Sequence, residues 1–306
     1  MEKAQKRLSQ ILAKHSSIPI SDYKHLKIAN TIISHGKKRN RILKYFRFVG
    51  CFIVLITLCQ SDVLLTRKKC LLSAPPSFTN LFRQPEDCNI CQSITKIDKV
   101  YNISYQDFDR IYAKNSKPVL IKNATQGWKA MEVFDFDFIK DLYSSVDNFQ
   151  DPTCQFFRYK TEFNSLTEAL NMSPARAKLT AGEEPWYIGW SNCNKEGENI
   201  LQDYFQKPYF LPSLSENIAF SWIFMGGPGK GAPLHVDNVL FPSWQAQIKG
   251  RKEWRLSPPP ECSFECKSMS VIVEPGDIIA VDSNLWYHET IILPGELSIT
   301  IGAEFD

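Results

Sequence analysis

The chain has 306 residues, of which 43% are hydrophobic and 23% are charged, which is typical of a globular protein with an ample core and excludes a disordered chain. The net charge of +3 is unevenly distributed: residues 1–47 hold twelve Lys and Arg against two acidic residues, whereas residues 48–306 hold 24 against 31. Most of the chain is therefore net acidic. This excludes a nucleic-acid-binding function that depends on overall basicity.

The N-terminal region combines a basic segment with an apolar one. After the polar residues 1–44 comes Phe48–Cys59, which has no charge, and nineteen residues separate Arg47 from Arg67. That length can span a bilayer, although a buried core helix is an alternative interpretation. More basic residues precede the apolar run than follow it, which favours a cytosolic N-terminus. We therefore predict a signal anchor at 45–66 after a cytosolic tail (1–44), and a single-pass type II membrane protein of the endoplasmic reticulum, Golgi or cell surface.

In that topology the residues after 66 are lumenal, and two features agree with it. Three glycosylation sequons lie on this side, at Asn102, Asn123 and Asn171. Seven cysteines also follow the apolar run, at positions 70, 88, 91, 154, 193, 262 and 266. In an oxidising compartment six of them can pair and leave Cys70 over, with a connectivity that the sequence does not give. The alternative is a zinc site made from the Cys88-x-x-Cys91 and Cys262-x-x-x-Cys266 pairs.

Residues 67–96 are rich in Pro, Ser and Asn and have little periodicity, which is typical of a stem. From residue 97 to 306 the pattern indicates one domain. Helices are expected at 104–114, 134–143 and 165–170; Ser104 and Ser165 are N-cap residues, and Glu168 completes a capping box. Strands are expected at 118–122 and repeatedly from 186 onward, separated by Pro-Gly turns. The predicted fold is therefore mainly β with flanking helices, as a barrel or double-sheet jelly roll.

One motif in the β-rich part has the pattern of a metal site. His235-Val236-Asp237 places a histidine and a carboxylate two residues apart, which in a strand means on the same face. A second histidine, His288, follows 51 residues after Asp237. Two histidines and one carboxylate on one face of a β scaffold form the facial triad of non-haem Fe(II) oxygenases. We predict His235, Asp237 and His288 as metal ligands with a catalytic role.

The distribution of histidine supports this interpretation. Three of the five histidines, His15, His25 and His35, lie in the basic N-terminal region, and the only two after residue 36 are those of the motif. The competing interpretation is that each is an ordinary core or surface histidine. Scattered histidines would not be expected to fall together in one H-x-D…H pattern.

Several segments in order resemble the cupin-like JmjC hydroxylases, which are Fe(II)- and 2-oxoglutarate-dependent oxygenases built on a double-stranded β-helix. The segments are KPVLIKNATQGW, PYFLP, GAPLHVD, QIKGRKEW and PGDIIAVDSNLWYHE. The resemblance covers about residues 97–306. It implies that His235, Asp237 and His288 bind Fe(II), and that Fe(II), 2-oxoglutarate and O2 are the cofactors.

The resemblance also implies a 2-oxoglutarate site. Lys252 matches the lysine that pairs with the distal carboxylate of 2-oxoglutarate, because a second carboxylate buried in the barrel requires a cation. Gln245 is a candidate hydrogen-bond partner of the co-substrate, with a surface amide as the alternative. Family members often have Thr or Ser three residues before the first histidine, where this chain has Ala232. Tyr187 is a candidate replacement, with a core aromatic as the alternative.

The expected activity is hydroxylation or demethylation of a protein side chain, with a protein as the substrate partner, a membrane contact through the one helix and no nucleic acid. Two alternatives stay open. One is a catalytically silent cupin-like binding or scaffold protein of the secretory pathway, which Ala232 favours. The other is a cupin metalloenzyme of different chemistry. The sequence does not indicate the oligomeric state.

Overall fold

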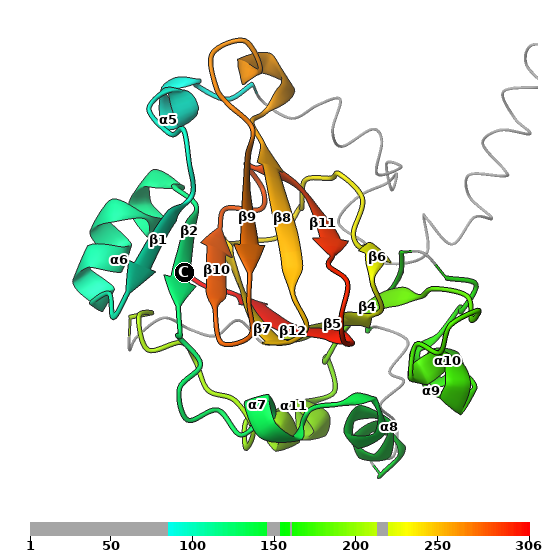
Figure 1. Ribbon diagram of the computed structural model, residues 1–306. Helices are drawn as coiled ribbons and strands as arrows, with labels where there is room; N and C mark the ends of the chain where they lie inside the picture. Colours follow the sequence, from blue (N-terminus) through cyan, green and yellow to red (C-terminus); the bar gives the residue numbers. More distant parts are fainter. Residues whose placement is uncertain (1–84, 146–153, 160, 213–219) are drawn as a thin grey trace, which may run out of the picture. The chain divides into compact units, whose positions relative to one another are not determined.

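A computed structural model describes residues 85–145, 154–159, 161–212 and 220–306. All of them belong to one compact unit that comprises residues 84–306. The predicted cytosolic tail, anchor (45–66) and most of the predicted stem lie outside the described residues. Figure 1 shows the strands of this unit as two layers, with most of the helices beside one of them.

The larger sheet has eight strands in the order β1-β2-β10-β7-β12-β5-β4-β3. Neighbouring strands are antiparallel except β1 and β2, which are parallel. Its strands are β1 (Asp98–Tyr101), β2 (Val119–Lys122), β3 (Phe156–Arg158), β4 (Tyr187–Ser191), β5 (Trp222–Gly226), β7 (Ser243–Lys249), β10 (Ile278–Val281) and β12 (Ser298–Glu304). The smaller sheet has the order β6-β11-β8-β9, with β6 (Gly229–Lys230), β8 (Lys252–Ser257), β9 (Met269–Val273) and β11 (Tyr287–Ile292).

Central strands of the larger sheet, such as β10 and β12, are buried on both faces, and the strand period assigns alternate residues to two cores. In β10, Ile278 and Ala280 belong to the core on the helical side, whereas Ile279 and Val281 belong to the second core. The second core also contains Trp254 and residues of β9, so it lies between the two sheets. Strands buried on both faces are near-continuously apolar, which explains runs such as Ile278–Val281. Prediction of a mainly β, jelly-roll-like fold with flanking helices is confirmed.

The helices are short, and most of them pack on the first core, whereas α5 (Asn89–Gln92) contributes Cys91 to the second. The others are α6 (Tyr105–Ile111), α7 (Ala130–Val133), α8 (Phe136–Ser145), α9 (Leu166–Leu170), α10 (Pro174–Ala177) and α11 (Lys195–Leu201), with 3-10 turns η2 (Ala113–Asn115) and η3 (Pro260–Cys262). The three expected helices correspond to α6 with η2, α8 and α9. Ser104 and Ser165 are N-caps as predicted, each accepting a backbone N–H three residues on. The Glu168 carboxylate accepts from the Asn164 N–H, one residue before the cap, so the capping box is incomplete.

Three disulfides join six of the cysteines. Two of them, Cys88–Cys262 and Cys91–Cys266, attach α5 to the connection between β8 and β9, and the third is Cys154–Cys193. Figure 1 shows α5 beside that connection. The pairing of these six cysteines agrees with the sequence prediction, and it excludes a zinc site at 88, 91, 262 and 266 in this state. Cys91 and Ile94, from the segment expected as a stem, are buried in the core between the sheets.

The prediction of a single-pass type II membrane protein with a lumenal domain requires correction. No helix among the described residues is long and apolar enough to cross a membrane. This finding contradicts the predicted type II membrane protein, and the described helices give no support to the predicted membrane contact. The three sequon asparagines are exposed. Asn102 and Asn123 have positive φ values, a backbone conformation that asparagine tolerates, so both have a structural role in turns.

Candidate functional site

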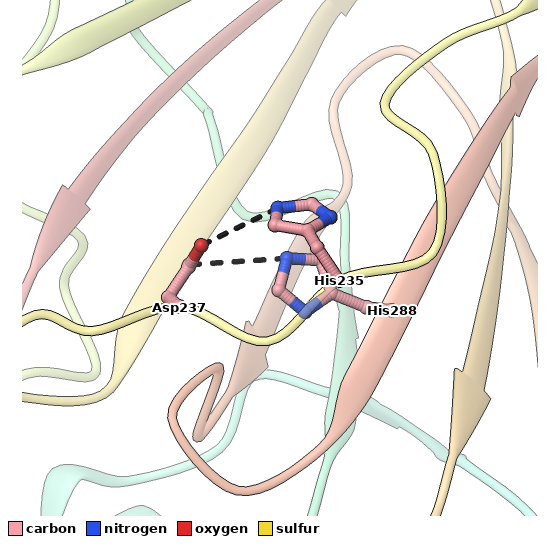
Figure 2. Close-up of side chains that lie close together, drawn as sticks. All are labelled: His235, Asp237 and His288. Carbon is pink, nitrogen blue, oxygen red and sulfur yellow. Dashed lines mark ion pairs between the residues drawn. The ribbon is translucent and has the colours of Figure 1, made fainter. Parts of the chain in front are cut away.

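His235, Asp237 and His288 come together between the sheets and point toward one another (Figure 2). Each offers one ligand atom, and the three atoms lie within 4.8 Å of one another. Asp237 Oδ1 is 3.3 Å from His235 Nε2, and Asp237 Oδ2 is 3.8 Å from His288 Nε2. The structure therefore brings all three predicted ligands into one cluster of two imidazole nitrogens and one carboxylate.

The backbone fixes this arrangement. His288 lies in β11, and His235 forms an isolated antiparallel bridge to it, with N–H···O distances of 3.1 and 2.8 Å in the two directions. The Asp237 N–H donates to the Ser283 carbonyl at 2.8 Å. His235 and Asp237 were expected in a strand, but they lie in the connection between β6 and β7. The shared face thus results from one β-bridge and a loop contact, and not from a strand.

The hydrogen bonds of the two histidines select one tautomer. Nδ1 of His235 lies 2.6 Å from the Pro233 carbonyl, and Nδ1 of His288 lies 3.0 Å from the Trp286 carbonyl. Because a carbonyl only accepts, each Nδ1 must carry a hydrogen, so Nε2, the nitrogen that faces Asp237, is the one that binds a metal once it carries no hydrogen. A backbone carbonyl on the second ring nitrogen is the usual support for a metal-binding histidine. The donor set therefore fits a divalent transition metal with open coordination positions.

The electrostatics of the cluster agree with an anionic carboxylate. Burial alone would raise the pKa of Asp237, but the hydrogen bond from His235 and the nearby His288 lower it below the usual value. Burial alone would lower the pKa of His235, and the hydrogen bond to Asp237 outweighs burial and raises it. Burial lowers the pKa of His288, which keeps this ring neutral and able to bind a metal.

The three ligands face a cavity of about 280 Å³. Aromatic side chains form much of its wall, including Phe157, Tyr159, Trp222, Phe224 and Trp254. Tyr187, Ala232 and Thr290 line it as well. A largely apolar cavity with a few converging polar groups is the usual form of a small-molecule site.

Lys252 is fully buried next to this cavity and has no acidic partner among the described residues. Its ammonium donates to the Tyr187 hydroxyl at 3.0 Å and to Thr300 Oγ1 at 2.6 Å, and it lies over the rings of Tyr187 and Phe224. Burial lowers the pKa of Lys252 to about 7. A buried cation without a counter-charge is costly, so this position is suited to receive an anion.

A chain of buried hydrogen bonds, the relay of Thr300 and Gln247, supports Lys252. Thr300 Oγ1 donates to Gln247 Oε1 at 3.1 Å, and Gln247 Nε2 donates to the Lys249 carbonyl and to Ser298 Oγ. The two donor contacts fix the amide orientation, so Oε1 must accept from Thr300. The Thr300 oxygen then accepts from Lys252. Thr300 and Gln247 therefore orient the ammonium.

Other candidates from the sequence occupy distinct places. Tyr187 is buried, lines the cavity and contacts Lys252, which exceeds the role of a core aromatic. Gln245 also lines the cavity. Thr290, Thr300 and Gln247 were not predicted. The strand period could have revealed two of them. Thr290 lies two residues after His288 on the same buried face of β11, and Gln247 lies two residues after Gln245 in β7.

A second feature of the cavity wall is a buried hydrogen-bond donor without a partner. The Trp254 indole is 2% exposed and lines the cavity, and its Nε1–H has no hydrogen-bond partner among the described residues. Most buried indole N–H groups are hydrogen-bonded, so this donor fits an acceptor on a bound molecule. Together with Lys252, it matches a small anionic ligand such as a dicarboxylic acid.

The sequence comparisons agree with the fold and the site. The sequence profile of the cupin-like domain family matches residues 105–264, which is more than half of the chain. The chain therefore belongs to this family. The predicted resemblance to the JmjC and cupin-like proteins is thereby confirmed.

Three named relatives show the range of activities among similar proteins. The chain is 26% identical to the arginine-specific demethylase JMJ20 of Arabidopsis thaliana, over 68% of this chain and 57% of that protein. It is 20% identical to the mouse 2-oxoglutarate and iron-dependent oxygenase JMJD4, over 67% and 60%. It is 22% identical to the bifunctional arginine demethylase and lysyl-hydroxylase psr-1 of Caenorhabditis elegans, over 55% and 42%. The chain thus spans less than two thirds of each relative's length.

Among solved structures, the chain is similar to the ribosomal oxygenase YcfD of Escherichia coli. The identity is 21%, the TM-score is 0.43, and the match covers 67% of this chain and 51% of that one.

Proposed function

We propose that this protein is an Fe(II)- and 2-oxoglutarate-dependent oxygenase that hydroxylates or demethylates a protein side chain. One observation carries the proposal. The His235–Asp237–His288 cluster faces a cavity lined by Tyr187, and the buried Lys252 that contacts Tyr187 has no acidic partner among the described residues. A metal-binding triad and an uncompensated cation on one cavity match a co-substrate that binds a metal at one end and carries an anion at the other.

Each residue has a role in this proposal. His235, Asp237 and His288 hold Fe(II), while Lys252 and Tyr187 hold the distal carboxylate of 2-oxoglutarate, and Gln245 is a further candidate contact. The bound iron, with 2-oxoglutarate and O2, supplies the oxidising chemistry. The aromatic wall excludes water from the metal, and the carbonyls of Pro233 and Trp286 keep both imidazoles in the binding tautomer.

The substrate class is proposed from the relatives. The names of JMJ20 and psr-1 describe activities on arginine or lysine residues, so a protein side chain is the substrate class that these names favour.

A catalytically silent binding protein is the second candidate, and Ala232 is the observation that favours it. This residue is buried and lines the cavity, but its methyl group cannot donate a hydrogen bond to a co-substrate. A cupin metalloenzyme of other chemistry would keep the triad and have no use for Lys252.

Binding of 2-oxoglutarate to the iron-loaded full-length chain tests the proposal. Under anaerobic conditions with Fe(II), chelation of iron by the 2-oxo acid gives a visible metal-to-ligand charge-transfer band. We expect the band to saturate with 2-oxoglutarate and to weaken strongly in Lys252→Met. The matched control is Lys267→Met, which removes an exposed lysine and leaves the titration unchanged.

Admission of O2 completes the test. Release of succinate that requires both Fe(II) and 2-oxoglutarate supports the oxygenase. If iron binds but 2-oxoglutarate gives no band, the proposal is rejected and the silent binding protein becomes the better interpretation.

A further inference from the structure

Ala232 lacks a hydroxyl, yet a hydroxyl lies next to it. The backbone N–H of Ala232 donates at 3.0 Å to Oγ1 of Thr290, which lies in β11, the strand that carries the second histidine. Gly231 makes the room for this contact, because a Cβ atom at that residue would come within 2.4 Å of Thr290 Oγ1. The local sequence Gly231-Ala232 thus admits the Thr290 side chain at the place where residue 232 has no polar group.

Thr290 occupies the middle of the cavity wall. It lies two residues after His288 in β11 and is paired across the ladder with Trp254, while Lys252 lies two residues from Trp254 in β8. Side chains two apart in a strand share a face, so His288, Thr290 and Lys252 follow one another from the metal end to the cationic end. Thr290 is 5% exposed and lines the cavity.

The polar groups here have more hydrogens than acceptors. The Lys252 ammonium has three N–H groups, two of which meet Tyr187 and Thr300. The Tyr187 hydroxyl also hydrogen-bonds Thr290. The Thr290 oxygen already accepts from Ala232, and the Tyr187 oxygen from Lys252. The contact between the two hydroxyls uses one of their hydrogens, so the other hydroxyl hydrogen and the third ammonium hydrogen are available to an external acceptor. A carboxylate that accepts from both hydroxyls replaces the contact between them.

We propose that Thr290 donates a hydrogen bond to the distal carboxylate of 2-oxoglutarate and replaces the hydroxyl that Ala232 lacks. Tyr187 provides the second hydroxyl and Lys252 provides the charge. This inference rests on the proposed function, and it removes the reason to regard Ala232 as a sign of a lost co-substrate site.

The test compares two ligands on two variants of the iron-loaded full-length chain. 2-Oxopentanoate keeps the chelating 2-oxo acid but has a methyl group in place of the distal carboxylate. Dissociation constants for both ligands are measured anaerobically from the charge-transfer band in the wild type, Thr290→Val and Thr290→Ser. Valine keeps the shape of threonine without the hydroxyl, and serine keeps the hydroxyl. Fe(II) affinity is measured separately for each protein.

For 2-oxoglutarate we expect Thr290→Val to weaken binding by about tenfold to a hundredfold, because one hydrogen bond to a charged group is lost. We expect Thr290→Ser to retain most of the affinity. For 2-oxopentanoate we expect no difference between wild type and Thr290→Val. Ala232→Ser added to Thr290→Val should recover part of the loss. Thr125→Val, which changes a buried threonine outside the cavity wall, is the matched control.

The outcomes separate this inference from the proposed function. If the wild type binds 2-oxoglutarate and Thr290→Val binds it equally well, the role of Thr290 is overturned and the oxygenase proposal stands. If Thr290→Val weakens both ligands alike, Thr290 has a structural effect only and the inference also fails. If the iron-loaded wild type binds no 2-oxoglutarate, both fail together.

Discussion

The indole of Trp254 stacks on the imidazole of His288, with ring centroids 5.6 Å apart and an angle of 19° between the planes. The imidazole is thus held on one side by an aromatic face and at Nδ1 by the Trp286 carbonyl. The same indole has a buried N–H without a partner in the described part of the chain. Trp254 therefore has two separable properties: it packs against a metal ligand, and it carries a buried donor that no described residue satisfies.

Trp254→Phe separates these two properties, because phenylalanine stacks but does not donate. We expect Fe(II) affinity to stay close to that of the wild type, and 2-oxoglutarate affinity to fall by about tenfold through loss of a hydrogen bond to an oxygen of the ligand. Anaerobic titration of both ligands checks this. Trp186→Phe is the control, since its indole donates to the Arg176 carbonyl outside the cavity. Equal 2-oxoglutarate affinity in Trp254→Phe and wild type would show that the indole N–H does not contact the ligand.

The metal assignment is tested by replacing a ligand with its nearest uncharged analogue. Asp237→Asn removes the anionic ligand between two histidines. We expect Fe(II) affinity to fall by more than about a hundredfold, which exceeds the loss typical of a residue that only supports a ligand. The circular dichroism spectrum should be unchanged. Asp141→Asn, on the exposed side of α8, is the matched control. Full iron occupancy in Asp237→Asn would exclude Asp237 as a ligand.

The binding of 2-oxoglutarate should depend on pH through Lys252. The pKa of this residue is lowered to about 7 by burial, and a carboxylate beside the amine raises it in the complex. The complex therefore holds more protons than the free protein above pH 7, so affinity is greatest below that pH and falls by up to about tenfold per unit above it.

Charge-transfer titrations at saturating Fe(II) between pH 6 and 9 measure this dependence. Lys252→Arg keeps its charge over the whole range, so any binding that it retains should lose the dependence. A wild-type dissociation constant that is constant over this range would contradict a neutral lysine in the free protein.

The relay behind Lys252 should contribute to stability. Thr300→Val leaves an ammonium hydrogen and the Gln247 Oε1 atom without partners in a buried network. We expect a loss of about 1–3 kcal/mol in the free energy of unfolding, with Thr300→Ser close to wild type, because the hydroxyl is what the network requires. Urea denaturation monitored by fluorescence tests this. A stability of Thr300→Val equal to that of Thr300→Ser would exclude the relay.

The two disulfides at α5 are redundant as loop closures. They close loops with sequence separations of 174 and 175 residues between the same two segments. Removing Cys88–Cys262 alone leaves nearly the same loop closed, so we expect a loss of less than about 1 kcal/mol, whereas removing both should cost about 2–5 kcal/mol. Thermal unfolding of the serine variants checks the difference. Additive losses from the two single removals would contradict this account.

The sequence was most informative where the chemistry is local. Short β-rich segments separated by Pro-Gly turns predicted the strands from residue 186 onward, and Ser104 and Ser165 predicted helix starts. The metal cluster was also visible, because histidine is rare outside the N-terminal region. His235 and Asp237 were nevertheless assigned to a strand, since spacing alone does not distinguish a ladder from a single bridge.

What the sequence did not predict depends on contacts between distant segments. Thr290, Thr300 and Gln247 are common residue types in strands, and their importance appears only when β4, β8, β11 and β12 meet around Lys252. The disulfide partners were unpredictable for the same reason, because cysteines with suitable spacing can pair or bind zinc. The apolar run at 48–59 led to a topology that the described helices do not support.

The bridge between His235 and His288 has a consequence for metal loading. Their backbone amides are hydrogen-bonded to each other's carbonyls, so the spacing of the two imidazoles is set before any ion arrives. An ion then orders few additional dihedral angles, and its binding loses little conformational entropy. Slow deuterium exchange at these two amides should therefore already be present in the metal-free protein, and iron should add affinity without adding much rigidity.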